Sequence, residues 1–210
     1  MKSREPLNQR NLVRSNGHEL IDVTSSVLLV IDIQQPFLNK YDRAKTQALI
    51  SKVSWLIGVA AHLDVPIVAM AEDIDRNGSL VGDVASALPN GTIIHNKDFF
   101  GLNDNPAIFS AVEKTGRTTA ICVGMETDVC VMHSALGLLS KGYRVMTLQD
   151  AVATTEFDER IGIERMRQAG VMIGSVKSLF YEWMRSVSSC RRFDNLAPEL
   201  RGNRPPDLVL

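Results

Sequence analysis

Residues 119–148, TAICVGMETDVCVMHSALGLLSKGYRVMTL, contain two short apolar runs separated by a helical segment. The runs Thr119–Val123 and Tyr143–Leu148 are typical of strands covered on both faces, because such strands are apolar throughout instead of alternating. Asp128–Lys141 is predicted to be a helix, and Gly142 directly after it suits a left-handed helix cap. The stretch therefore predicts a strand–helix–strand unit of a parallel sheet.

The same alternation continues on both sides of this unit. Four more apolar runs are predicted strands: Val27–Ile31, Pro66–Ala71, Thr92–His95 and Val171–Gly174. The remaining predicted helices are Arg43–Leu63, Val81–Leu88, Pro106–Thr115, Asp158–Ala169 and Ser175–Val187. Strands that alternate with helices favour an α/β fold, a doubly wound six-stranded parallel sheet with helices on both faces.

Composition excludes several classes of protein. The 210 residues are 45% hydrophobic and carry a net charge of −1, which disfavours a disordered chain and a basic nucleic-acid-binding protein. No apolar run is long enough to span a membrane, and the charged N-terminus does not resemble a secretory signal. Three cysteines are too few for a disulfide framework, so a cytoplasmic location is expected.

The two ends of the sequence differ from its middle. Residues 1–20 lack periodicity and are predicted to be an N-terminal arm, and 188–210 is a tail rich in Arg, Pro and Asn. The tail is either partly disordered or packed on a neighbouring subunit through its apolar residues Leu196, Leu200, Leu208 and Val209. The domain is expected to cover 21–187.

Three chemically active residues follow predicted strands. Asp32 comes directly after the first strand, Lys97 follows the third, and Cys130 follows the fourth. Ligands of open parallel sheets bind beyond the carboxyl ends of the strands, so these residues are candidates for one site. Each also has a plain alternative: a turn-capping carboxylate, a surface lysine and a buried apolar cysteine.

The surroundings of Cys130 favour reactivity. Thr127 or Asp128 is a good N-cap, which would place Cys130 in the first turn of a helix. A helix N-terminus and a nearby lysine both favour the thiolate, which is the reactive form of cysteine. Three aromatic residues near the strand ends are predicted to line a substrate pocket: Phe37, Phe99 and Phe100.

No metal or cofactor is expected. The four histidines lack the close spacing of a metal motif, and no glycine-rich phosphate loop follows the first strand. An aspartate, a lysine and a cysteine that meet in one site can carry out nucleophilic catalysis without a metal.

Four stretches resemble the isochorismatase-like cysteine hydrolases, a family that includes nicotinamidases and carbamoylsarcosine amidases. They are VLLVIDIQQPF (27–37), IIHNKDFF (93–100), CVGMETDVCVMHSALGLLSKGYRVMTLQDAVAT (122–154) and ERIGIERMRQAGV (159–171). The resemblance implies strand order 3-2-1-4-5-6, the catalytic set Asp32, Lys97 and Cys130, and a cis peptide bond between Met125 and Glu126. It also implies a homo-oligomer.

The mechanism implied by the resemblance agrees with the residue chemistry. Asp32 would take the thiol proton, Lys97 would stabilise the thiolate, and Cys130 would attack a carbonyl carbon. The oxyanion would lie against the backbone N–H groups of Glu126 and Cys130. The expected activity is metal-independent hydrolysis of a C–N bond in a small amide or carbamoyl compound.

The sequence departs from two subgroups of this family. Nicotinamidases with a metal site carry an Asp-x-His pair, whereas 72–76 reads EDIDR without a histidine. Isochorismatases proper lack the cysteine nucleophile. A nicotinamidase, a catalytically idle binding or scaffold protein and an oxidation-sensing thiol at Cys130 are the alternatives.

Overall fold

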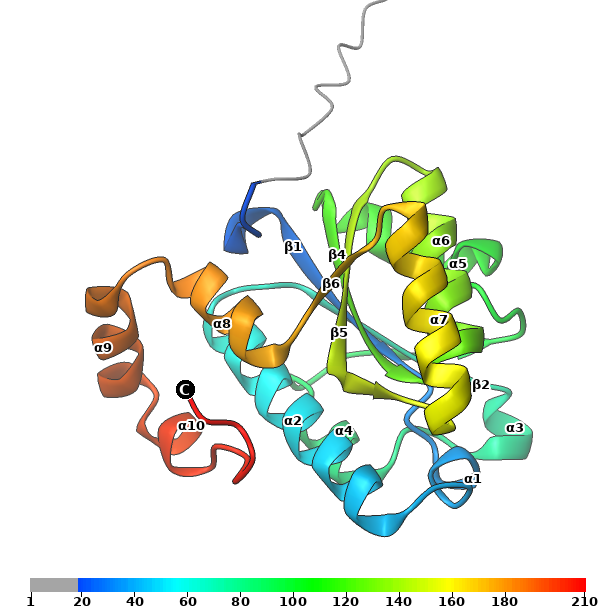
Figure 1. Cartoon of the computed structure of the whole chain (residues 1–210), viewed down its shortest axis with the longest axis horizontal. Helices are drawn as coiled ribbons and strands as arrows, with labels where there is room; N and C mark the ends of the chain where they lie inside the picture. Colours follow the sequence, from blue (N-terminus) through cyan, green and yellow to red (C-terminus); the bar gives the residue numbers. More distant parts are fainter. Residues whose placement is uncertain (1–18) are drawn as a thin grey trace, which may run out of the picture.

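Six parallel strands form the sheet of the computed structural model, which describes residues 19–210 (Figure 1). They are β1 Ser26–Ile31, β2 Ile67–Glu72, β3 Ile94–Lys97, β4 Thr119–Met125, β5 Arg144–Ala153 and β6 Met172–Gly174. Their order in the sheet is β3-β2-β1-β4-β5-β6, and every pair is parallel. The predicted doubly wound fold and its strand order are confirmed.

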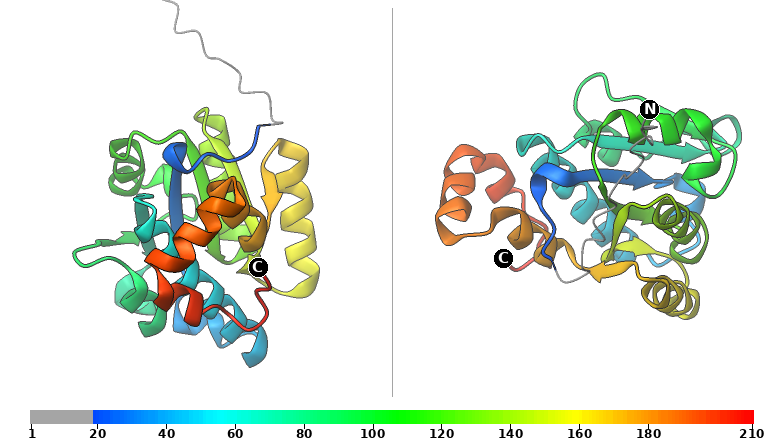
Figure 2. Two further views of the ribbon diagram at one scale, coloured as in Figure 1. Left: turned by 90° about the vertical axis from the view of Figure 1, so that its left-hand side faces the viewer. Right: turned by 90° about the horizontal axis from the view of Figure 1, so that it is seen from above.

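Helices cover both faces of the sheet (Figure 2). The main ones are α2 Arg43–His62, α4 Gly82–Ala87, α5 Pro106–Lys114, α6 Met132–Ser140, α7 Glu156–Ala169 and α8 Val176–Met184. The short ones are η1 Val23–Ser25, α1 Gln35–Leu38, α3 Ile74–Asn77 and η2 Leu102–Asp104. Among residues 19–210, no helix is long and apolar enough to cross a membrane.

The central strand β1 divides the core into two halves. Leu28 and Val30 pack with residues of α2, α4 and α8, whereas Leu29 and Ile31 pack with α5, α6 and α7. All six residues of β1 are buried, because successive side chains of a strand point to opposite faces and both faces are covered.

Two neighbouring strands, β2 and β3, end further along the chain than their apolar runs predict. β2 reaches Glu72 and β3 occupies Ile94–Lys97, and Glu72 pairs with Lys97 in the sheet. None of residues 92–95 is buried, and Ile93 is 66% exposed, so the apolar run does not mark the strand. Pairing with β2 places the strand at 94–97 instead. Two charged residues therefore lie at the last positions of neighbouring strands.

The turn after β4 also differs from the prediction. Residues Thr127–Val131 form a π-helical turn, η3, in which the Val131 N–H donates to the Glu126 carbonyl. The cap position is Glu126 and no side chain caps it, so neither Thr127 nor Asp128 is the N-cap. Cys130 lies inside this π-turn, immediately before α6.

The C-terminal tail packs on its own chain as two helices, α9 Val187–Leu196 and α10 Pro198–Gly202. Trp55 of α2 donates its indole N–H to the Leu200 carbonyl at 2.8 Å, and Leu208 is 5% exposed. Leu196 and Val209 remain exposed in the single chain. Of the predicted N-terminal arm, residues 1–18 lie outside the described part of the chain.

β1 and β4 approach closely at Gly124, just before the ends of both strands. Its φ is +127°, and a Cβ built there would lie 1.9 Å from the Ile31 carbonyl oxygen. Only glycine suits this position, because a side chain would clash with the backbone as well as strain its own. The close contact brings the two strand ends that precede Asp32 and Cys130 together.

Gly124→Ala is expected to lower the free energy of unfolding by on the order of 3 kcal/mol or more, because overpacking adds to backbone strain. Gly142→Ala is the matched control, since Gly142 also has positive φ but nothing lies within 4 Å of its Cβ position. Urea unfolding measures both. Equal losses of stability in the two variants would contradict the close contact.

Candidate active site

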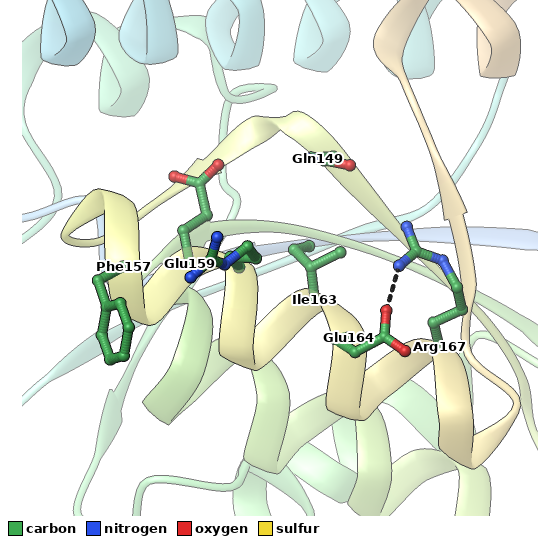
Figure 3. A pocket seen from close by; sticks show the side chains of 7 residues that line it. Gln149, Phe157, Glu159, Ile163, Glu164 and Arg167 are labelled. Atoms are coloured by element: carbon green, nitrogen blue, oxygen red, sulfur yellow. Dashed lines mark hydrogen bonds and ion pairs between the residues drawn. The ribbon is translucent and has the colours of Figure 1, made fainter.

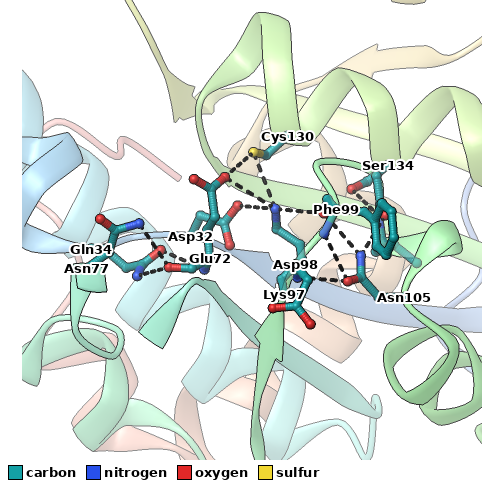
Figure 4. A network of polar contacts seen from close by, with 12 residues as sticks. Asp32, Gln34, Glu72, Asn77, Lys97, Asp98, Phe99, Asn105, Cys130 and Ser134 are labelled. Carbon is teal, nitrogen blue, oxygen red and sulfur yellow. Dashed lines mark hydrogen bonds and ion pairs between the residues drawn. The ribbon is translucent and has the colours of Figure 1, made fainter. Parts of the chain in front are cut away.

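The ends of three strands bring Asp32, Lys97 and Cys130 together (Figure 4). The Lys97 ammonium lies 3.0 Å from Asp32 Oδ2 and 3.4 Å from Cys130 Sγ. Asp32 and Lys97 are fully buried, and Cys130 is 4% exposed. Asp32 directly follows β1 and has φ +51°, a left-handed conformation that aspartate tolerates better than most residues. The plain alternative of a surface lysine does not fit the full burial of Lys97.

A fourth residue, Glu72, completes the cluster and was not singled out in the sequence. The Cys130 thiol donates a hydrogen bond to Glu72 Oε2 at 3.2 Å, and the Lys97 ammonium lies 3.6 Å from the same oxygen. Glu72 is the last residue of β2. The argument that selected Asp32, a charged residue at the end of an apolar strand, also applies to Glu72 and would have found it.

One buried side chain outside the cluster, that of Asn105, fixes the loop after β3. Asn105 accepts hydrogen bonds from the N–H groups of Asp98 and Phe99 and donates to the carbonyls of Phe99 and Gly101. The Phe99 carbonyl also accepts a hydrogen bond from Lys97 at 3.2 Å. The loop after β3 is therefore held by hydrogen bonds of the Asn105 side-chain amide, which help to keep Lys97 directed at Cys130.

The aromatic residues predicted to line a pocket lie in two places. Phe99 and Phe100 are 58% and 53% exposed, and the Phe100 ring centroid is 6.0 Å from the Lys97 ammonium. Phe37 lies in α1, packs against the core, and has the Lys40 ammonium 4.8 Å from its ring centroid. Phe100 thus adjoins the cluster, whereas Phe37 belongs to the neighbouring helix.

The Met125–Glu126 peptide bond is cis and joins β4 to the turn that carries Cys130. The Glu126 side chain accepts hydrogen bonds from Tyr41 at 2.5 Å and from Lys40 at 3.1 Å. These contacts anchor the start of η3 to the segment that follows β1. The assignment of the Glu126 and Cys130 N–H groups to an oxyanion remains a prediction.

Burial governs the protonation of the cluster. Burial raises the pKa of Asp32 to about 6, although the Lys97 cation opposes this rise. Burial and then the charge of Asp32 raise the pKa of the Cys130 thiol far above its ordinary value, and Lys97 only partly offsets them. Burial alone would lower the pKa of Lys97, but Asp32, Cys130 and Glu72 raise it. Burial and the neighbouring carboxylates therefore favour the thiol form of Cys130 over the thiolate.

The donor atoms of Asp32, Glu72 and Cys130 lie within 4.8 Å of one another, a spacing that could suit a metal ion. The Lys97 ammonium, however, contacts all three groups. A cation is thus already present among these ligands, and a metal ion there would face its repulsion. The donor set fits an ammonium-centred cluster better than a metal centre.

A separate hollow lies on the surface of α7 and has a volume of about 580 Å³ (Figure 3). It is lined by Gln149, Phe157, Glu159, Arg160, Ile163, Glu164 and Arg167, and it shares no residue with the cluster. Glu164 and Arg167 form an exposed ion pair in it at 2.8 Å. None of these lining residues carries a thiol or hydroxyl group.

The arrangement at the strand ends can support covalent catalysis. It places one nucleophile and two proton acceptors within 3.6 Å of one ammonium group, which meets the requirement for an activated nucleophile. Asp32 Oδ1 makes no hydrogen bond with any part of residues 19–210 and is free to accept a proton.

Comparisons with known proteins show the family to which the chain belongs. A model of the isochorismatase domain matches residues 26–178. A secreted isochorismatase effector, Isc1 of Phytophthora sojae, is 31% identical over 75% of this chain and 76% of its own length. The Escherichia coli YcaC gene product, described as an octameric hydrolase of unknown specificity, is 24% identical with a TM-score of 0.76, covering 87% of this chain and 93% of its own.

A more distant structure shares the fold. N-carbamoylsarcosine amidase from Thermoplasma acidophilum has a TM-score of 0.61 and 16% identity, covering 72% of this chain and 96% of its own. At this identity the likeness concerns the fold alone. The match of the domain model extends from β1 into α8 and so includes every residue of the cluster.

Iodoacetamide is expected to label Cys130 slowly at pH 7 and about tenfold faster for each unit of pH up to about 9, because only the thiolate reacts. Burial also raises the pKa of Cys122, to about 12, and this residue should stay unlabelled in the folded protein. Mass spectrometry of peptides follows each site. A rate at Cys130 that is fast and independent of pH would show a resting thiolate instead.

Proposed function

Because the chain belongs to the isochorismatase family, we propose that this hydrolase cleaves a C–N bond of a small amide or carbamoyl compound through a covalent acyl-enzyme. The observation that carries the proposal is the position of the Lys97 ammonium, 3.0 Å from Asp32 and 3.4 Å from the Cys130 sulfur. The reaction needs no metal in this scheme, since the thiol supplies the nucleophile and the carboxylates move the protons.

The first half of the reaction forms the acyl-enzyme. Cys130 Sγ attacks the carbonyl carbon, an S–C bond forms, and the thiol proton passes to a carboxylate beside the sulfur. The C–N bond then breaks, and the nitrogen leaves as ammonia or an amine after it takes up that proton. Because a thiol becomes nucleophilic only when it loses its proton, the attack depends on a carboxylate close to the sulfur, and the cluster supplies two.

The second half releases the acid. A water molecule attacks the thioester carbonyl, and Asp32 takes the proton of this water and returns it to the departing sulfur. Lys97 balances the negative charge that moves between Asp32 and Cys130. The N–H groups of Glu126 and Cys130 are proposed to receive the oxyanion, and Phe99 and Phe100 to contact the substrate beside the cluster.

Substrate chemistry separates this proposal from its alternatives. A vinyl ether offers no carbonyl carbon for a thiol to attack, so Cys130 favours an amide. The loop after β2 has no histidine, which disfavours a metal-dependent nicotinamidase. A catalytically idle protein would have no use for a buried lysine that two carboxylates and a thiol surround, since burial of these charges is costly.

We also propose that the chain forms a homo-oligomer. The E. coli YcaC protein is described as octameric. In the single chain Val187, Leu196 and Val209 are 64–73% exposed, which leaves apolar surface for a second copy to cover. The cytoplasmic location expected from the cysteine content stays a prediction, and the Phytophthora relative is named a secreted protein.

Incubation with a panel of small primary amides and carbamoyl compounds is expected to release ammonia from at least one of them. Cys130→Ala should abolish the release because the bond-forming atom is gone, and Asp32→Asn should slow it by about 10²–10⁴-fold through loss of the general base. Cys190→Ala is the matched control and should keep full activity. No hydrolysis across the panel, or an active Cys130→Ala variant, would favour the binding-protein alternative.

Turnover is expected to fall below about pH 6, by about tenfold for each pH unit, and to level off above it. Asp32 must be ionised to take a proton, and its pKa of about 6 means that the protonated, inactive form dominates at lower pH. Initial rates between pH 4.5 and 8 measure this, with circular dichroism at each pH to confirm folding. An undiminished rate in folded protein at pH 5 would contradict the role of Asp32.

A further inference from the structure

The cluster holds two carboxylates beside one nucleophile, and they are not equivalent. Asp32 is fully buried and its Oδ2 is paired with the Lys97 ammonium at 3.0 Å. Glu72 has a side chain that is 22% exposed, and its Oε2 accepts the hydrogen bond of the Cys130 thiol at 3.2 Å. The thiol proton of the resting protein is therefore directed at Glu72, on the solvent side of the cluster.

Hydrogen bonds to the backbone of Glu72 hold this residue in place. Gln34, which is fully buried, donates to the Glu72 carbonyl at 2.8 Å and accepts from the Glu72 N–H at 2.8 Å. Asn77 donates to the same carbonyl at 3.1 Å (Figure 4). The next residue, Asp73, has φ +42° and turns the chain away from the strand. These four features keep the Glu72 carboxylate at the sulfur, unlike that of a mobile surface glutamate.

Three charged groups face Cys130 from the neighbouring strands: Asp32 after β1, Glu72 at the end of β2 and Lys97 at the end of β3. Two negative charges and one positive charge disfavour a further negative charge on the sulfur. The sulfur can become nucleophilic only as its proton leaves, and Glu72 Oε2 accepts the hydrogen bond of the thiol at 3.2 Å.

We propose that Glu72 is a fourth catalytic residue, which takes the proton of Cys130 during the attack and delivers it to the leaving nitrogen. This proposal rests on the proposed amide hydrolysis and reassigns its first proton transfer, which the sequence had led us to expect at Asp32. As the S–C bond forms, the S–H bond breaks and the proton binds Glu72 Oε2. As the C–N bond breaks, the same proton moves to the nitrogen, and Glu72 is again a carboxylate.

The exposure of the two carboxylates suits this division of roles. A leaving group departs toward solvent, on the side of the partly exposed Glu72, whereas Asp32 is fully buried and paired with Lys97. Asp32 is then kept for the second half of the reaction, in which it activates water and maintains the position of the Lys97 ammonium.

Alkylation tests the contact without any substrate. Glu72→Gln removes one negative charge and the acceptor of the thiol proton, so iodoacetamide should modify Cys130 about tenfold faster at pH 7 and the pH profile should shift to lower pH. Asp75→Asn removes an equal charge from exposed α3 on the same loop and should keep the wild-type profile. A Glu72→Gln profile that coincides with that of Asp75→Asn overturns the proposal.

Turnover tests the catalytic role. With an amide that the panel identifies, Glu72→Gln should lower kcat by about 10²-fold or more, although its thiol reacts faster with iodoacetamide. Glu72→Asp, which keeps the charge on a shorter side chain, should retain more turnover than Glu72→Gln. Simple structural damage would slow both reactions, and urea unfolding of each variant detects it.

A wild-type kcat in Glu72→Gln would overturn the proposal even if the alkylation profile shifts, because Glu72 would then act only through its charge. If no amide in the panel is hydrolysed, the proposed function fails separately, and the catalytic role of Glu72 fails with it. The alkylation profile then decides only whether Glu72 holds the thiol proton.

Discussion

One buried ammonium group, that of Lys97, constrains this end of the molecule. A buried cation is costly unless anionic groups surround it, and removal of one partner of such a cluster leaves an uncompensated charge. Asp32, Glu72 and Cys130 surround it from three other strand ends. Because the four groups stabilise one another, the loops that carry them are held closely: Gln34 and Asn77 bind the backbone of Glu72, and Asn105 binds the loop after Lys97.

The sheet order makes this cluster possible. β1 lies between β2 and β4, so the ends of three adjacent strands supply Asp32, Glu72 and the turn that holds Cys130, and β3 adds Lys97 from the next position. Gly124 lets β4 approach the carbonyl of Ile31 just before both chains turn out of the sheet. The order of the strands thus brings Asp32 and Cys130 into one cluster, although 98 positions separate them in the sequence.

The sheet was predicted from its apolar runs. Asp32, Lys97 and Cys130 were predicted because each of these three residues follows an apolar run that is typical of a buried strand. Glu72 was not predicted because the apolar run before it ends at Ala71, one residue short of the end of β2. The protonation of Cys130 could not be derived either. It depends on burial and on the distance to two carboxylates, neither of which appears in local sequence. The position of the C-terminal tail could not be predicted for a similar reason. Its packing depends on a contact with Trp55, which is far away in the sequence.

The π-helical turn at Cys130 makes this part of the chain sensitive to length as well as to composition. A π-helical turn contains one residue more than the α-helical turn it replaces. In this protein the extra residue lies in Thr127–Val131, between β4 and α6, which are both anchored in the core. Deletion of a single residue would convert the turn to an ordinary helical one. The sulfur would then rotate by about 100° around the helix axis, away from Lys97. Homologous proteins that keep this site should therefore vary in the amino acids of the segment between β4 and α6 but not in their number.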